Sequence, residues 1–525
     1  MTGVLLGILL LSSTVLADAG GGWPSAGNDL QNTRYQNTEN KISPSNVGTL
    51  APKWVFTTGG DVSATPAVDG TTVYVPDWAG NLYAIDRKTG QQVWKVSIAA
   101  VTGVLGDKAR ATPALAGDKV IIGTQGTVLA PTGGAGGWVL AFNKNTGALL
   151  WQTKADDHQA AIITQSATVF GDRVYVGVAS LEEGLAAFVP GYQLSFRGSM
   201  LALDLNTGAI VWKTYMVPTG YTGAAVWGSS PAIDTKRGQL YIATGNNYSA
   251  PQSVLDCVTA AGTNPDAIKL CISPDDHFDS VLALDLKTGA IRWSYRAIPY
   301  DTWTGTCIFG GVCPNPAGPD YDFGQAPALF TAKDGGKGKP RDLVGAGQKS
   351  GQYWALDPDT GAVVWVTQAG PGGTSGGLQW GSAVDGQRIY TANANSGDGK
   401  PGHDHVAWHG TDTSGVWSAL DAATGQLIWE TRPPDGDYVG SLGGTTSGPV
   451  TTANGVVFGC SLKPAGHMYA LNAATGVVLW DFTSGGSCVS GAAISNGMVF
   501  WGSGYSNFGM GTPNNKVYAF SLGGK

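Results

Sequence analysis

The string Ala84-Ile85-Asp86-Arg87-Lys88-Thr89-Gly90, followed by Trp94, decides the fold because it returns along the whole chain. It stands again at Ala141-Phe142-Asn143-Lys144-Asn145-Thr146-Gly147, with Trp151 at the same distance. Five further copies keep this spacing, and their markers are Asp204, Thr207, Gly208 and Trp212; Asp285, Thr288, Gly289 and Trp293; Asp357, Thr360, Gly361 and Trp365; Asp421, Thr424, Gly425 and Trp429; and Asn472, Thr475, Gly476 and Trp480. Such regular self-similarity is typical of repeat architectures.

Each copy has the pattern of a β-hairpin. An alternating strand such as Val73-Tyr74-Val75 precedes the string, and a second such as Gln92-Val93-Trp94-Lys95 follows it. The Asp or Asn side chain can cap the turn, and the Gly supplies the positive φ that a hairpin loop with a bulge requires. Because the Trp recurs at a fixed place, we expect it to pack against the neighbouring unit as core.

The two ends of the chain complete the count of units. The final strand, residues 517–520, lacks a following Trp segment, and Lys53-Trp54-Val55-Phe56 near the start is that missing strand. The sequence therefore predicts an all-β fold, an eight-bladed β-propeller with four-stranded antiparallel blades, in which N- and C-terminal strands close the ring. Residues 20–523 are expected to form this single domain. The 79 Gly and 18 Trp residues, with only 13% charged residues, agree with packed sheets and tight turns.

Charge and the N-terminal segment restrict the partners. A net charge of -7 without a basic run predicts no nucleic acid partner and no attraction to an anionic membrane. Residues 1–17 read as a signal peptide, with a short apolar run and small residues near its end. The alternative, a membrane anchor, needs about 20 apolar residues. We therefore expect a secreted or periplasmic protein with no membrane span.

Six cysteines in an exported chain can pair fully. The pairings that we expect first are Cys257 with Cys271, Cys307 with Cys313, and Cys460 with Cys488, although six cysteines allow 15 connectivities.

Polar residues outside the repeat stand where strands end. Glu182-Glu183 follows residues 174–178, Asn246 follows residues 240–242, and Asp301 is expected to close a later strand. Carboxylate and amide oxygens from successive blades make a ligand shell suited to Ca²⁺. The alternative is that these are solvated loop residues, and spacing alone favours that alternative.

Several strings resemble the pyrroloquinoline quinone-dependent alcohol dehydrogenase family over nearly the whole mature chain. They are Asn32-Thr33-Arg34-Tyr35, the repeats themselves and Thr244-Gly245-Asn246. Within that family, residues 110–114, 180–183 and 376–383 look most like the polyvinyl alcohol dehydrogenases. The resemblance implies a cofactor, PQQ, and a Ca²⁺ ion or another divalent or lanthanide ion. It also implies oxidation of an alcohol substrate, a secondary alcohol or a polyvinyl alcohol-type chain, by hydride transfer to the quinone.

The same resemblance implies roles for individual residues. Glu182 or its neighbour Glu183, with Asn246 and Asp301, would ligate the cation, and Trp227 would be the floor on which the quinone stacks. The residues that would contact the cofactor's carboxylates, its quinone oxygens or the cavity wall are Arg110, Lys349, Arg197, Ser166, Asn393 and Thr445. Each has a structural alternative: Trp227 as core, Lys349 as an exposed residue and Arg110 in a surface salt bridge. Trp380 is an equally balanced candidate.

Three departures from the family pattern affect the prediction. Methanol-type relatives show D-x-W-D at the base position, whereas this chain reads Asp301-Thr302-Trp303-Thr304. Asp301 is then the remaining acid there and is expected to act as base, as ligand or as both, with loss of activity as an alternative. No adjacent Cys-Cys pair can cover the quinone, so the Cys307–Cys313 loop is a candidate cap. No C-x-x-C-H occurs, so electrons are expected to leave to an external electron acceptor, a cytochrome c or a soluble quinone.

Alternative functions and minor motifs stay open. A non-catalytic propeller that binds proteins at its rim is the main rival, and a sugar or aldehyde quinoprotein is another. The residues His403, Asp404, His405 and His409 favour a polar rim loop over a metal site. Asn247-Tyr248-Ser249 is a formal glycosylation sequon, but it adjoins the proposed ligand Asn246.

Overall fold

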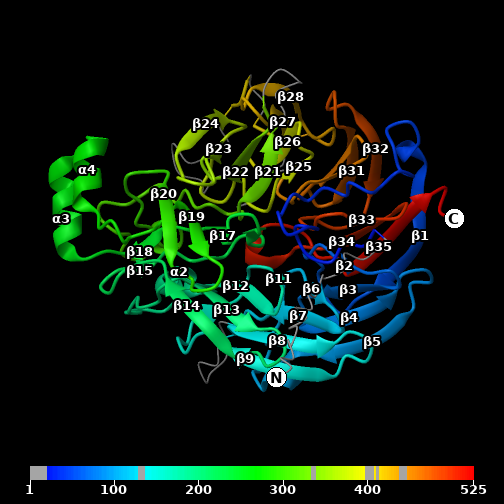
Figure 1. Cartoon of the computed structure of the whole chain (residues 1–525), viewed down its shortest axis with the longest axis horizontal. Coiled ribbons are helices and arrows are strands. Elements are labelled where there is room, and N and C mark those ends of the chain that lie inside the picture. The colour runs from blue at the N-terminus through cyan, green and yellow to red at the C-terminus, as the bar shows by residue number, and fades with distance from the viewer. Residues whose placement is uncertain (1–20, 128–135, 333–338, 397–406, 410–412, 437–445) are drawn as a thin grey trace, which may run out of the picture.

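The repeat produces a closed ring of sheets (Figure 1). The structure is a computed structural model and describes residues 21–127, 136–332, 339–396, 407–409, 413–436 and 446–525. In that part of the chain, eight sheets of four or five antiparallel strands follow one another around an axis, and a two-stranded ribbon accompanies them. The predicted eight-bladed β-propeller is confirmed. The expected signal peptide, residues 1–17, lies outside the described residues.

The first four blades follow the chain from its beginning. Their strands are, in order, β2 (Ala67–Val68), β3 (Thr72–Pro76), β4 (Asn81–Asp86) and β5 (Gln92–Ser97); β6 (Ala114–Ala116), β7 (Lys119–Gly123), β8 (Trp138–Asn143) and β9 (Leu149–Lys154); β10 (Ala161–Ile162), β11 (Thr168–Phe170), β12 (Arg173–Ser180), β13 (Ser199–Asp204) and β14 (Ile210–Tyr215); and β16 (Ala232–Asp234), β17 (Gln239–Ala243), β19 (Ser280–Asp285) and β20 (Ile291–Arg296).

The remaining blades continue in the same direction. Their strands are β21 (Ala328–Ala332), β22 (Arg341–Gly347), β23 (Gln352–Leu356) and β24 (Val363–Gln368); β25 (Ala383–Val384), β26 (Arg388–Asn393), β27 (Val416–Asp421) and β28 (Leu427–Thr431); β29 (Thr451–Ala453), β30 (Val456–Cys460), β31 (His467–Asn472) and β32 (Val478–Thr483); and β33 (Ala493–Ser495), β34 (Met498–Ser503), β35 (Lys516–Leu522) and β1 (Leu50–Thr57).

Short helices and one ribbon occupy the connections. The ribbon pairs β15 (Thr222–Gly223) with β18 (Asn247–Ser249). The helices are α1 (Ile98–Thr102), α2 (Glu182–Phe188), α3 (Gln252–Ala261), α4 (Pro265–Cys271) and α5 (Thr306–Phe309), with 3-10 turns η1 (Val47–Thr49) and η2 (Asn507–Gly509). Figure 1 shows α3 and α4 projecting outward from the ring beside β15 and β18.

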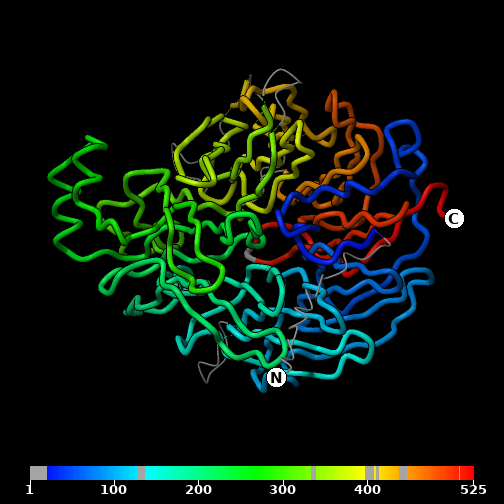
Figure 2. Tube along the Cα trace, viewed as in Figure 1, coloured from blue at the N-terminus to red at the C-terminus, as the bar shows by residue number. Residues whose placement is uncertain are grey.

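The two ends of the described chain close the ring. β1 pairs antiparallel with β35, from Leu50 opposite Leu522 to Thr57 opposite Lys516. Figure 2 shows these segments side by side, although they come from opposite ends of the sequence. The predicted closure is confirmed: β1 supplies the fourth, outermost strand of the last blade.

In each repeat, the turn of one blade packs against the tryptophan of the adjacent blade. In the first copy, Thr89 N–H and Oγ1–H both donate to Asp86 Oδ1 at 2.7 Å. Gly90 has a φ of 75°, and a Cβ there would lie 2.7 Å from the Trp54 ring of the preceding blade. Trp54 Nε1 donates to Arg87 O at 3.0 Å. The Gly is therefore needed both for its backbone conformation and for the approach of the ring, and the expected packing of Trp against the neighbouring unit is confirmed.

All three expected disulfides are present: Cys257–Cys271, Cys307–Cys313 and Cys460–Cys488. The first joins α3 to α4, and the second closes the loop that contains α5. In the described part of the chain, no helix is long and apolar enough to cross a membrane.

Candidate active site

A pocket at the centre of the ring collects loop residues from many blades. It encloses about 570 Å³, including space open to solvent. Its lining residues are Ala26, Arg34, Ser63, Ala64, Thr65, Arg110, Ala111, Thr112, Thr164, Ser166, Trp227, Ser229, Trp380, Pro449, Val489 and Tyr505. The structure thus brings together three residues that the sequence singles out for cofactor contact: Arg110, Ser166 and Trp227. Trp380, the balanced candidate, lines the same pocket.

Two indole rings and a guanidinium form one side of this pocket. The Trp227 and Trp380 rings meet edge to face, with centroids 5.7 Å apart. The Arg110 guanidinium carbon lies 5.6 Å from the centroid of the Trp380 ring, and Arg110 Nε is buried without a hydrogen-bond partner. Burial lowers the pKa of Arg110, and nearby Tyr505 partly offsets that shift. A flat anionic ligand in the pocket would supply the missing acceptor.

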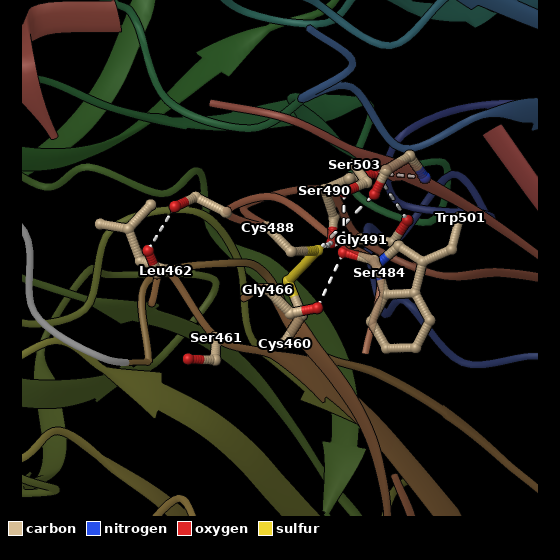
Figure 3. The surroundings of a disulfide bond; sticks show 12 residues. Cys460, Ser461, Leu462, Gly466, Ser484, Cys488, Ser490, Gly491, Trp501 and Ser503 are labelled. Carbon is tan, nitrogen blue, oxygen red and sulfur yellow. Dashed lines mark hydrogen bonds between the residues drawn. A yellow bond between two sulfur atoms is a disulfide. The ribbon is translucent and has the colours of Figure 1, made fainter. Parts of the chain in front are cut away.

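Another part of the pocket wall comes from the C-terminal part of the sequence and is held by contacts of the last blade (Figure 3). Cys488, bonded to Cys460 at the end of β30, directly precedes the lining residue Val489. Ser490 Oγ donates to the backbone oxygen of Ala64 at 2.7 Å, and Trp501 Nε1 donates to Ser490 O at 2.6 Å. These bonds fix the Val489 loop against the first blade.

Trp227 connects the pocket to a cluster of buried acids. Its ring lines the pocket, while its Nε1 donates to Asp322 Oδ2 at 3.0 Å. The Lys349 ammonium lies 5.8 Å from the ring centroid and pairs with Asp320 at 2.8 Å and Asp322 at 3.2 Å. Burial lowers the Lys349 pKa, but the surrounding carboxylates outweigh it and the net shift is upward. Lys349 is therefore a buried cation, and not the exposed residue of the structural alternative.

Asp301 lies deep in this cluster. It is fully buried, and its two oxygens accept from Asp320 N at 3.1 Å and Tyr321 N at 2.7 Å. Burial raises its pKa to about 6, although these backbone donors oppose the shift. The expectation that Asp301 closes a strand is wrong, because β20 ends at Arg296 and Asp301 lies in the loop beyond it. The Asn247–Thr302 bridge anchors that loop.

Asn246 lies just beyond the end of β17, and its side-chain amide oxygen can bind a ligand. Its side-chain Nδ2 donates to Asn247 O at 3.0 Å and to Trp303 O at 2.9 Å. Both N–H groups are thereby used, so the amide oxygen is the atom available to a ligand. The backbone N–H of Asn246 donates to Asp322 Oδ1 at 2.7 Å, which ties this strand end to the acid cluster.

The adjacent residues Glu182 and Glu183 have different surroundings. Glu182 is fully buried and accepts backbone N–H bonds from Ser195 and Phe196. Glu183 Oε1 is buried without a hydrogen-bond partner. Burial raises the Glu183 pKa to about 8, with attraction to Lys349 opposing the shift and repulsion from Asp322 and Asp301 adding to it. Glu183, and not Glu182, has an unsatisfied oxygen toward the acid cluster.

The cluster contains more carboxyl groups than cations. Its carboxyl groups belong to the buried residues Asp279, Asp301, Asp320 and Asp322 and to Glu183, whose Oε1 is buried, and Lys349 is the ammonium among them. Burial, together with mutual repulsion, raises the pKa of Asp279 and of Asp320 well above the ordinary value. Uncompensated buried charge is costly, so such a cluster either holds protons or binds a cation.

These donors fit a hard cation such as Ca²⁺, which prefers carboxylate and amide oxygens. The fit rests on the unpartnered Glu183 oxygen and the freed oxygen of Asn246. Within the described ranges, no group of three or more His, Cys, Asp or Glu side chains is gathered closely enough to be a metal site by itself. The amide oxygen of Asn246 is thus a candidate ligand beside the carboxylates.

Besides Lys349, three predicted contact residues lie away from the pocket lining or outside the described residues. Arg197 Nε donates to Val217 O at 2.9 Å, and its guanidinium lies 4.3 Å from the Tyr215 ring centroid. Asn393, at the end of β26, is fully buried and both polar atoms of its side chain lack a partner. Thr445 lies outside the described residues, as do His403, Asp404 and His405 of the polar rim loop.

The proposed cap and the sequon have clear places in the structure. The Cys307–Cys313 loop contains α5, which packs against α2 through Phe309 and Phe188, and its residues are not among those that line the pocket. Asn247 of the sequon is buried, and its Nδ2 donates to Asp276 at 2.8 Å. Its side chain is therefore a structural contact next to Asn246.

Sequence reasoning missed three of the five carboxyl groups in the acid cluster. Asp279, Asp320 and Asp322 were not expected in the site. The available signal was the alternation Asp320-Tyr321-Asp322 before Phe323-Gly324, which no repeat explains. Arg34 and Tyr505 of the pocket were also missed as site residues, although Arg34 belongs to one of the strings that carry the resemblance.

The chain is similar to known proteins in sequence and in fold. A family model, PQQ_2, described as outer membrane protein assembly factor BamB, matches residues 36–295 and 349–524. The polyvinylalcohol dehydrogenase of Pseudomonas sp. is 29% identical over 96% of this chain and 77% of its own length. The polyvinylalcohol dehydrogenase of Sphingopyxis sp. is 28% identical with the same coverage, 96% and 77%. The solved quinohemoprotein alcohol dehydrogenase from Comamonas testosteroni superposes with a TM-score of 0.70 at 20% identity, covering 96% of this chain and 81% of that chain.

Proposed function

The chain belongs to the PQQ_2 family of β-propellers, and we propose that it is a pyrroloquinoline quinone-dependent alcohol dehydrogenase similar to the polyvinyl alcohol dehydrogenases. The single observation that carries the proposal is the buried, unpartnered Oε1 of Glu183 in a cluster that has more carboxyl groups than cations. A propeller that only binds proteins at its rim gains nothing from this costly arrangement beside an axial pocket.

The cation would be held by Glu183 in the first turn of α2 after β12, and by Asn246 and Asp301 in the loops after β17 and β20. Ca²⁺ suits these oxygen donors, and another divalent or a lanthanide ion is held by the same chemistry. The bound cation would offset the repulsion among the carboxylates and keep Glu183 ionised at neutral pH.

The quinone would lie in the pocket against the Trp227 ring. Arg110 donates to its carboxylates, Ser166 lies in the wall, and Lys349 is aimed across the Trp227 ring. Arg197, Asn393 and Thr445 stay proposed wall residues. When bound, the cofactor supplies the hydride acceptor.

Asp301 is the proposed proton acceptor for the substrate hydroxyl. In the cation-free protein, burial raises its pKa to about 6, so the carboxylate is more basic than that of an ordinary Asp and still largely ionised at neutral pH. The N–H groups of Asp320 and Tyr321 hold both oxygens in place, so the carboxylate does not need to reorient before it accepts the proton on Oδ1 or Oδ2.

We also propose that the substrate is a secondary alcohol or a polyvinyl alcohol-type chain, and that electrons leave to a separate acceptor such as cytochrome c or a soluble quinone. The residues 1–17 support secretion or a periplasmic location. A single domain over residues 20–523 completes the proposal.

The test mixes purified quinone-free protein with pyrroloquinoline quinone and Ca²⁺, then follows reduction of an artificial dye on addition of a secondary alcohol or polyvinyl alcohol. We expect calorimetric binding of the quinone and alcohol-dependent turnover. Absence of quinone binding by the folded wild-type protein would disprove the proposal. Quinone binding with Asp301→Asn at full turnover would leave the enzyme in place but remove Asp301 as the base.

A further inference from the structure

We propose that Glu182 is a positioning residue, which fixes the start of α2 so that its neighbour Glu183 delivers an oxygen to the cation. The inference rests on the proposed function, since it concerns the same cation site. It assigns different tasks to two adjacent carboxylates that the sequence alone treats as interchangeable.

The contacts of Glu182 leave its carboxylate little capacity for a metal. Ser195 N–H donates to Oε1 at 2.9 Å and to Oε2 at 3.1 Å, and Phe196 N–H donates to Oε2 at 2.8 Å. Tyr192 Oη donates to Oε1 at 3.3 Å. The side chain is completely buried, so these donors replace water around the charge. Because its oxygens accept these hydrogen bonds, the Glu182 carboxylate holds the backbone of Ser195 and Phe196 in place.

His158 adds a further donor to this anchor. The backbone N–H of Ala160 donates to His158 Nδ1 at 3.1 Å, which leaves Nε2 to carry the proton of the neutral ring. Nε2 lies 2.9 Å from Ser195 Oγ and 3.2 Å from Glu182 Oε1. Glu182 therefore links the loop before β10 and the 192–196 segment to the first turn of α2.

Glu183 depends on that turn for its direction. Successive residues of an α-helix point about 100° apart, so fixing Glu182 toward residues 195–196 turns Glu183 to another side, where the acid cluster lies. The N-cap residue Leu181 makes no side-chain cap, and Ser180 Oγ accepts the Glu182 N–H at 3.2 Å. The Gly305 N–H donates to the backbone oxygen of Glu183 at 3.0 Å. The Glu182 anchor and this bond together set the Glu183 backbone.

The experiment measures Tb³⁺ binding to the full-length, quinone-free protein by luminescence, with Ca²⁺ as competitor. The variants are Glu182→Gln, Glu183→Gln and the matched control Glu39→Gln. Glu39 is also a buried carboxylate that accepts backbone N–H bonds, from Lys41, Ile42 and Gly497, but it is not in the acid cluster. Luminescence lifetimes in H₂O and D₂O count the water molecules on the bound ion.

We expect Glu182→Gln to weaken Tb³⁺ binding by about 10- to 100-fold, as for outer partners of metal ligands, while leaving the number of waters at saturation unchanged. Glu183→Gln should weaken binding further and add water to the ion, and Glu39→Gln should bind as the wild type. If Glu182→Gln fails to fold, His158→Ala replaces it, with an expected loss of roughly 2- to 10-fold for one hydrogen bond.

The outcomes separate this inference from the function on which it rests. A folded wild type that does not bind Tb³⁺ would contradict the proposed cation site and the inference together. Wild-type binding with unchanged affinity in Glu182→Gln, or in His158→Ala where that variant is used, would overturn the positioning role alone. Extra water in Glu182→Gln and none in Glu183→Gln would reverse the two roles.

Discussion

Replacing Gly318 by Ala tests the position of the proposed base without changing any titratable group. Gly318 lies against Asp301, and a Cβ at this position would be 2.1 Å from Asp301 Oδ1, 2.5 Å from its Cα and 2.8 Å from its Cγ. Ordinary contact begins at 3.4 Å, and the short contact with Cα means that backbone as well as side chain must shift, by more than 1 Å at Oδ1. We expect this shift to displace the Asp301 carboxylate from the N–H groups of Asp320 and Tyr321.

A misplacement of this size costs about 100-fold in turnover, or roughly 2.7 kcal/mol of transition-state stabilisation. Overpacking should also lower the free energy of unfolding by roughly 1–3 kcal/mol. The assay is dye-linked alcohol oxidation by reconstituted enzyme, with quinone binding measured separately. Gly70→Ala is the matched control, because a Cβ at Gly70 meets nothing within 4 Å. Turnover of Gly318→Ala equal to that of the control would refute the assignment of Asp301.

Three further predictions concern the ring, the cation and the pocket. Trp480→Ala should lower the free energy of unfolding by about 3–5 kcal/mol, measured by denaturant titration, because Trp480 is 8% exposed and its Nε1 donates to Leu50 O across the closure. In cation-free protein, the raised pKa values of Glu183, about 8, and Asp301, about 6, mean that the folded state binds protons more tightly than the unfolded state. The stability that these groups contribute is present below about pH 4 and is lost as the pH rises through 6 and then 8. The Tm measured by calorimetry should therefore fall between pH 4 and pH 8. Addition of Ca²⁺ should restore the Tm at pH 8. Trp227→Ala should weaken quinone binding by at least tenfold in calorimetry while the fold persists, since it removes the stacking surface; unchanged affinity would place the quinone elsewhere.

The repeat determined the fold from the sequence because each copy encodes a complete local unit. The turn chemistry of Asp86 and Gly90 and the place of Trp94 are short-range properties, so seven copies predicted the blades and their contacts. Closure also followed, because the unmatched strands at the two ends complement each other. Three disulfide pairs were predicted correctly from cysteines that lie close in sequence.

The site was less accessible to sequence reasoning because it depends on where loops meet. Nothing local distinguishes Glu182 from Glu183, and only the donors from residues 192–196 do so. The loop that carries Asp301 continues past its strand and is held by a bridge to Asn247. Asp320 and Asp322 approach from yet another loop, and Arg197 turns toward Val217. These arrangements are set by long-range packing and not by a periodic pattern.

The pairing of β1 with β35 also sets an order of events as the chain is made. The outermost strand of the last blade is among the first segments synthesised, and its contact with Trp480 spans 430 residues of sequence. Until β35 exists, β1 is a bare edge strand open to wrong partners. The central pocket takes Arg34 from one end of the chain and Tyr505 from the other, so it does not exist in any N-terminal fragment. A ligand of this pocket can therefore bind only after the chain has been completed through Tyr505.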